Sequence, residues 1–124
     1  MIANDFRRIA LGMKDAVEGS HMDHPDFRVN NRIFATLTHD EKLGMVSLSP
    51  EAQQGFMREH PSAFSPVNGS WGLQGATLID LASADEEVVG EAATIAWQHV
   101  AAGVRAGART TTRKKRNPTR ARRN

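Results

Sequence analysis

The sequence predicts an α+β fold of two layers, in which helices gather on one face of an antiparallel sheet. Three observations support this prediction. Apolar residues repeat at helical spacing near both ends of the first hundred residues and once between them. Short runs of strand-forming residues fill the intervening segments. Consecutive runs are joined by short turns, which favours hairpins and the element order α-β(3)-α-β(2)-α.

The first element is expected to be a short helix that Asn4 or Asp5 can cap. Its apolar positions follow the i, i+3, i+4, i+7 spacing of one helix face, namely Phe6, Ile9, Ala10 and Met13. Three strands are expected to follow it, at His21–Val29, Arg32–Thr38 and Lys42–Leu48.

Turn-forming residues separate these strands. Pro25 interrupts the first strand, so this strand is expected to be bulged or to lie at an edge. Asn30 and Asn31 predict a turn, because asparagine tolerates positive φ. Alternation along the second strand predicts two faces, one with Ile33, Ala35 and Leu37 and the other with Phe34 and Thr36.

A second helix is expected to begin at Ser49. The Ser49 side chain can cap it, and Pro50 suits the first helical position because no intrahelical partner is needed there. The helix is expected to run to about His60 and to stop at Pro61.

The remaining elements are a strand pair and a long helix. After a loop at Ser62–Asn68, strands are expected at Ser70–Leu73 and Ala76–Leu81, joined by a turn. Asp85 and the glutamates after it favour the start of the last helix, because acidic groups stabilise a helix N-terminus.

The charges of the chain are divided between two segments of opposite sign. Residues 1–100 hold seven basic and all fourteen acidic residues, for a net charge of −7, whereas residues 101–124 hold nine basic residues and no acid. We therefore divide the chain into a folded domain at residues 1–103 and a disordered basic tail at residues 104–124. A block of one charge sign is typical of a segment that contacts a polyanion.

The tail predicts contact with nucleic acid, because cations on a flexible chain can neutralise phosphates. It contains no aromatic residue for stacking and no groove-fitting helix, so binding is expected to be independent of sequence. The alternatives are another anionic partner, a solubilising extension, or contact with the acidic body of a neighbouring copy. The expected binding residues are Arg105, Arg109, Arg113, Lys114, Lys115, Arg116, Arg120, Arg122 and Arg123.

Composition excludes several classes of site. Cysteine is absent, which excludes disulfides, thiolate metal sites and thiol nucleophiles. Apolar runs stay well short of the roughly eighteen residues that span a bilayer, and the N-terminus lacks a basic region followed by an apolar stretch. We therefore expect a cytoplasmic protein with no membrane partner.

Three segments of the chain form a recognisable set. They are His24–Val29 with Arg32–Leu37, then Ala63–Val67, then Gly69–Gly72 with the pair Thr77 and Leu78. Together they resemble the MmcQ/YjbR family of small bacterial proteins, over about residues 1–101. The resemblance implies an α-β(3)-α-β(2)-α fold similar to that of secretion chaperones. It also implies the family's usual description, predicted DNA-binding proteins with a double-wing motif, and it supplies no catalytic residue.

Trp71 suggests a small-molecule pocket as a further hypothesis. It lies between Gly69 and Gly72, where it can line a cleft over the sheet with an arginine at the rim. The alternative is a packing anchor whose indole N–H is bonded to the backbone. The residues of the expected cleft are His24, Phe27, Arg28, Arg32 and Trp71.

We expect no enzymatic activity, no cofactor and no metal. The serines lie in no Gly-x-Ser-x-Gly motif, and the glycines of Gly69–Gly75 precede no predicted helix that could bind phosphate. His21 and His24 would face opposite ways on a single strand, which disfavours a shared metal. The rival to nucleic-acid binding is a protein-interaction module that uses the sheet or the helices.

Overall fold

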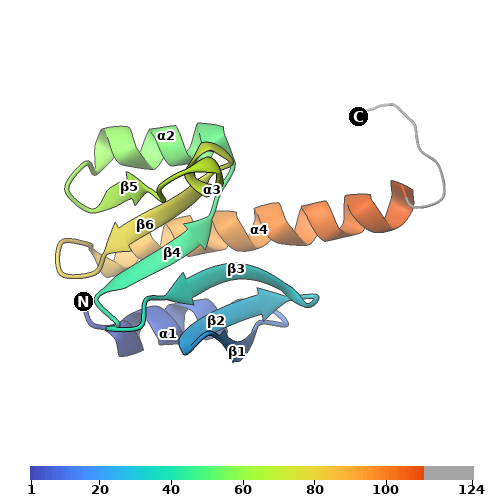
Figure 1. Ribbon diagram of the computed structural model, residues 1–124, viewed down its shortest axis with the longest axis horizontal. Coiled ribbons are helices and arrows are strands. Elements are labelled where there is room, and N and C mark those ends of the chain that lie inside the picture. Colours follow the sequence, from blue (N-terminus) through green and yellow to red (C-terminus); the bar gives the residue numbers. More distant parts are fainter. Residues whose placement is uncertain (111–124) are drawn as a thin grey trace.

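A computed structural model of the protein describes the backbone of residues 1–110 and the side chains of residues 1–103 (Figure 1). Helices and strands alternate along these residues. The helices are α1 (Ala3–Leu11), α2 (Pro50–Glu59), α3 (Ser70–Leu73) and α4 (Glu86–Thr110). The strands are β1 (Val17–His21), β2 (His24–Val29), β3 (Arg32–Leu37), β4 (Leu43–Ser47), β5 (Phe64–Pro66) and β6 (Ala76–Asp80).

The six strands form one antiparallel sheet in the order β1-β2-β3-β4-β6-β5. Helices α1 and α4 pack against each other and against the central strands, and α2 packs against β5 and β6. Figure 1 shows α4 running along the sheet and past its end. The predicted fold class, α+β with an antiparallel sheet, is confirmed.

Two local predictions are confirmed by side-chain and backbone geometry. The Ser49 hydroxyl accepts a hydrogen bond from the backbone N–H of Ala52 at 3.1 Å, as an N-cap should. Asn30 and Asn31 have φ angles of 51° and 67°, which make the tight turn between β2 and β3.

The prediction of a single strand at His21–Val29 is wrong. Two strands, β1 and β2, meet at a turn in which Met22 and Asp23 have φ angles of 51° and 66°. His21 and His24 are therefore cross-strand partners on one face, and their ring centroids lie 5.9 Å apart. The sequence did not indicate β1 because this edge strand is largely exposed and has no apolar alternation.

The prediction of a strand at Ser70–Leu73 is also wrong, since these residues form the short helix α3. The edge partner of β6 is instead β5, in which Phe64 lies opposite Ile79. Pro66 is tolerated there because an edge strand leaves some backbone N–H positions unpaired.

A register shift in the β2–β3 ladder places an extra residue in β3. Phe27 lies opposite Ala35 and Arg28 lies opposite Ile33, so Phe34 has no partner of its own. Phe34 and Ala35 are both fully buried, and the predicted alternation that separated them is wrong at this point. The shift changes the face of the sheet toward which the side chains before Phe34 point. Ile33 is therefore half-buried and does not join the core.

Candidate binding site at the fork between two strands

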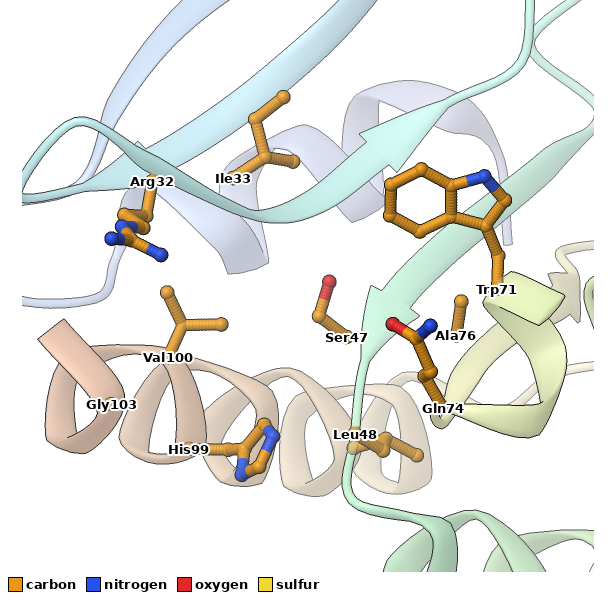
Figure 2. Close-up of a pocket in the computed structure, with 10 residues that line it drawn as sticks. All are labelled: Arg32, Ile33, Ser47, Leu48, Trp71, Gln74, Ala76, His99, Val100 and Gly103. Carbon is orange, nitrogen blue, oxygen red and sulfur yellow. The ribbon is translucent and has the colours of Figure 1, made fainter. Parts of the chain in front are cut away.

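Strands β3 and β4 separate near one end of the sheet. Their ladder comprises the pairs Ala35–Val46, Thr36–Met45 and Leu37–Gly44. Beyond Ala35, β3 follows β2, whereas β4 continues beside β6 as far as the pair Ser47–Ala76. Figure 2 shows the resulting gap, with β3 on one side, β4 and α3 on the other, and α4 beneath.

A cavity of about 350 Å³ occupies this gap, and we call it the fork cavity. Its volume lies at the lower end of the range of roughly 300–1,000 Å³ that is usual for small-molecule sites. Five secondary-structure elements contribute to its wall, together with one residue that directly follows β4 and one that directly follows α3. The lining residues are Arg32, Ile33, Ser47, Leu48, Trp71, Gln74, Ala76, His99, Val100 and Gly103.

Trp71 is the large aromatic residue of the fork cavity. Its side chain is 70% exposed, and within the described residues no hydrogen bond involves its indole N–H. Figure 2 shows the indole projecting from α3 across the gap toward β3. The predicted role of a packing anchor belongs instead to Trp97, whose partly buried indole donates to the carbonyl of Lys14 at 2.9 Å. Trp71 is therefore free to contact a ligand.

Two glycines fix the position of α3 and hence of Trp71. A Cβ atom at Gly72 would lie 1.8 Å from the carbonyl oxygen of Val67. At Gly75, where φ is 114°, a Cβ atom would lie 1.9 Å from the carbonyl oxygen of Leu48. Larger residues at these positions would push α3 away from the neighbouring backbone.

Gln53 connects α2 to the same short helix. Its side chain is buried at 3% exposure, and its amide nitrogen donates to the carbonyls of Gly72 at 3.1 Å and Ala76 at 3.0 Å. These two carbonyls flank the turn between α3 and β6, so one side chain fixes both ends of that turn. The sequence reasoning missed Gln53, because a buried glutamine on a helix is indistinguishable from an exposed one in the pattern of apolar residues.

The remaining polar groups of the fork cavity are suited to binding a ligand that has an anionic group and a hydrogen-bonding edge. Arg32 is exposed and forms no ion pair with any described residue. His99, Ser47 and Gln74 add an imidazole, a hydroxyl and an amide. Figure 2 places Arg32 and His99 at the end away from Trp71, with Ser47 between. The cavity therefore has an aromatic end and a cationic end.

A second polar group lies on β2, away from the fork. The carboxylate of Asp26 is fully buried and accepts hydrogen bonds from Arg28 Nε at 2.8 Å and Nη2 at 3.0 Å, and from His21 Nδ1 at 2.8 Å. The Arg28 guanidinium is the main reason that the pKa of Asp26 lies below its ordinary value of 3.8, while burial acts in the opposite direction. Each carboxylate oxygen is satisfied, so this cluster is a structural ion pair.

The structure brings together two of the five residues of the expected cleft. Arg32 and Trp71 line the fork cavity. Phe27 is fully buried in the core, with its ring against Phe6 at 6.1 Å between centroids, and Arg28 is held by Asp26. His24 lies between His21 and His39, with centroid distances of 5.9 and 6.3 Å.

The tail residues fall outside the described part of the structure. Seven of the nine predicted nucleic-acid-binding residues lie beyond Thr110, and Arg105 and Arg109 belong to the part of α4 whose side chains are not described. Within the described residues, no group of three or more histidine, aspartate or glutamate side chains is arranged to hold a metal ion. Nor does any helix of the described part have the length and apolar character required to cross a membrane.

The comparisons with known proteins identify the fold. No family model and no curated protein sequence matches this chain. Its structure is similar to the crystal structure of Deinococcus radiodurans protein DR2400, which contains the family-model domain DUF419. The likeness has a TM-score of 0.66 and covers 80% of this chain and 78% of that chain, at 18% sequence identity. At this identity the likeness shows a shared fold.

Proposed function

We propose that this chain is a non-enzymatic, MmcQ/YjbR-like protein that binds nucleic acid without sequence preference through its basic C-terminal residues. The observation that carries the proposal is the separation of charge. Residues 1–100 have a net charge of −7, and residues 101–124 have nine basic residues and no acid. Phosphate contacts of this kind provide affinity through the release of counterions and carry no sequence information.

The ion pairs of the folded domain support a role for the tail. Arg7 pairs with Glu18 at 3.1 Å, Arg8 with Glu86 at 2.6 Å, and Arg28 with Asp26 at 2.8 Å. The four basic residues that form no ion pair with any described residue are spread over four segments, at Lys14, Arg32, Lys42 and Arg58. A domain with net negative charge and few unpaired cations offers a poor surface to a duplex.

Family membership is supported by the fold of the neighbour. The DUF419 domain of DR2400 is YjbR/MmcQ-like, and this chain shares its fold. The segments that carry the sequence resemblance, from His24–Val29 to Thr77, lie within the domain that this fold comprises.

The test is a salt titration of the full-length chain against one labelled duplex. If six of the nine cations contact phosphates, the logarithm of the association constant falls with the logarithm of salt at a slope of about −5. The comparison protein is a full-length variant in which the seven basic residues beyond Thr110 are changed to glutamine. It should lose nearly all affinity, and an undiminished affinity would transfer the binding to cations of the folded domain.

A protein-interaction module is the second candidate, because exposed apolar groups surround a second cavity. Leu73 is 82% exposed and lines a cavity of about 590 Å³ between α2 and α3, together with Met57 and Val67. A partner segment could cover these groups and gain the free energy of burying apolar surface. Partners that remain bound after nuclease treatment, and that are lost in the variant Leu73→Asp, would favour this function.

A further inference from the structure

We propose that the fork cavity binds one unpaired nucleotide, with its base against Trp71 and its phosphate against Arg32. This proposal rests on the proposed function, since it specifies how a nucleic acid bound by the tail would contact the folded domain. It adds a preference that the tail alone cannot provide, namely a preference for single strands or free nucleotides over duplexes.

Trp71 supplies the surface on which a base can stack. It is 70% exposed, yet its position is fixed by the close approach of Gly72 to Val67 and by the hydrogen bonds of Gln53. An indole has only two rotatable side-chain bonds, so Trp71 on a fixed backbone loses little conformational entropy when a base stacks on it. Stacking of this kind is independent of sequence, because every base has an aromatic face.

Arg32 supplies the charge for the phosphate of the same nucleotide. It is exposed and forms no ion pair with any described residue, in contrast to Arg28, whose guanidinium is held by Asp26. A guanidinium can donate two hydrogen bonds to a phosphate, and the imidazole of His99 at the same end can add a further donor. Figure 2 shows this cationic end and the indole on opposite sides of the cavity.

The size of the fork cavity selects for an unpaired nucleotide. Its volume of about 350 Å³ accommodates one base with its sugar. In a duplex both faces of each base are covered by stacking, so a base must leave the helix before it can contact Trp71. The hydroxyl of Ser47 and the amide of Gln74 lie in the wall where they can bond the exposed edge of such a base.

The fork cavity also lies where the basic tail begins. Gly103 of α4 lines the cavity, and the first residue of the basic set, Arg105, follows two positions later. A strand whose base occupies the cavity therefore lies close to Gly103, and the nine cations follow this residue in the sequence. Stacking and phosphate neutralisation then act on the same strand.

The experiment measures binding of the full-length chain to an oligothymidylate of about ten nucleotides, by fluorescence polarisation and by tryptophan emission. The variant Trp71→Ala should weaken binding by about 5- to 150-fold, which corresponds to the loss of one stacked base. Arg32→Gln should also weaken it. Matched controls are Leu73→Ala, which removes an exposed apolar residue of the same helix outside the fork cavity, and Arg58→Gln, which removes an exposed cation of α2.

Tryptophan emission gives an independent readout of stacking. Oligothymidylate should quench the emission of the wild-type chain, and Trp71→Phe should abolish the quenching, because Trp97 is partly buried against the core and does not line the fork cavity. An oligomer of the same length that lacks bases should bind without quenching. Thymidine monophosphate distinguishes the source of the ligand: quenching by the monophosphate at similar affinity indicates a site for free nucleotides, and quenching by the oligomer alone indicates a strand-binding site.

The two proposals fail in different ways. If neither ligand quenches Trp71, or if Trp71→Ala binds the oligomer as tightly as wild type does, the nucleotide site is overturned while tail-driven binding stands. If the variant that lacks the seven cations beyond Thr110 still binds as tightly as wild type does and is still quenched, the nucleotide site stands and the tail model is overturned.

Discussion

Gly72 determines how closely α3 approaches the chain that precedes it. The computed position of a Cβ atom there, 1.8 Å from the Val67 carbonyl, requires the backbone to move. Gly90 in α4 is the contrasting position, because a Cβ atom there would contact nothing within 4 Å. The same substitution should therefore have opposite effects at the two glycines.

We predict that Gly72→Ala destabilises the protein by about 1–3 kcal/mol, the usual range for forcing an atom into packed structure. Gly90→Ala should stabilise it by about 0.5–1 kcal/mol, because alanine loses less backbone freedom in a helix. Urea denaturation followed by circular dichroism measures both. If the two variants changed the free energy of unfolding by the same amount, the close approach of Gly72 to the Val67 carbonyl would be contradicted.

Asp26 of β2 is hydrogen-bonded across the ladder to His21 of β1 and forms an ion pair with Arg28 of its own strand. The pKa of its carboxyl is depressed, mainly by Arg28, so the stabilisation is fully present above the ordinary value of 3.8 and is lost as the pH falls through the lower folded-state pKa. Above this range the charged carboxylate is both buried and fully hydrogen-bonded.

We predict that Asp26→Asn lowers the free energy of unfolding by about 1–3 kcal/mol at neutral pH, because the buried charged hydrogen bonds are lost. The difference from wild type should narrow as the pH falls below 3.8, where the unfolded chain takes up the proton first, and it should close as the pH passes through the lower folded-state pKa of Asp26 and the folded carboxyl also becomes neutral. Asp23→Asn, in an exposed turn, is the control and should change little. A difference that does not vary with pH would show that the carboxylate charge is not its source.

At the scale of elements, α3 is stabilised mainly by contacts with other segments of the chain. It is four residues long, too short to be stable on its own, and it depends on the hydrogen bonds that Gln53 donates to Gly72 and Ala76. Because Gln53 belongs to α2 and Trp71 belongs to α3, these hydrogen bonds make the position of Trp71 depend on the position of α2.

We predict that Gln53→Leu destabilises the protein by about 1–3 kcal/mol, because the carbonyls of Gly72 and Ala76 each lose one hydrogen bond and keep only the one from a backbone N–H. It should also shift the emission of Trp71 before global unfolding, at a urea concentration where the far-UV circular dichroism is unchanged. Gln54→Leu, at the exposed neighbouring position, should leave both signals unchanged.

The sequence predicted those elements whose own residues carry a local signal, such as a capping residue, a turn residue or a periodic pattern of apolar residues. The helix capped by Ser49 and the turn at Asn30 and Asn31 were predictable because capping and positive φ depend on residue type alone. Strand β1 and helix α3 were not, because an exposed edge strand has no apolar alternation and α3 is specified by contacts with Gln53 and Val67.

The fork cavity was predictable only in part. Trp71 could be singled out from the sequence as an aromatic residue between glycines. Arg32 could be singled out as a cation on a strand that was expected to border the same cleft. Ser47, Gln74 and His99 could not, because they join the site only where the β3–β4 ladder ends. The end of a ladder depends on the register shift at Phe34, and no local pattern reports it.

At the scale of the whole molecule, residues 1–100 and residues 101–124 have net charges of opposite sign, so under the proposed function they would act on a nucleic acid in opposite directions. Glu87 and Glu91 lie exposed on α4, and neither forms an ion pair with another described residue. They lie in the first turns of the helix whose other end leads into the tail, so under the proposed function their charge would repel tail-bound phosphates at low salt, where the Debye length is long.

We predict that changing Glu87 and Glu91 together to glutamine raises affinity for a duplex about twofold at low salt. The gain should disappear at high salt, where the Debye length is only a few ångströms. Fluorescence polarisation at the two salt concentrations measures this, and a gain that persists at high salt would point to a direct contact.

The short ladder between β3 and β4 divides the sheet into two three-stranded ribbons, β1-β2-β3 and β4-β6-β5, with α4 packed along both central strands. We expect this three-pair ladder to be the axis about which one ribbon twists relative to the other. The amide hydrogens of Ala35–Leu37 and Gly44–Val46 belong to buried central strands and should be well protected, so their exchange reports this twisting and not fraying at an edge. A molecule seated in the fork would restrain this twisting, so slower exchange at these amides would report its arrival.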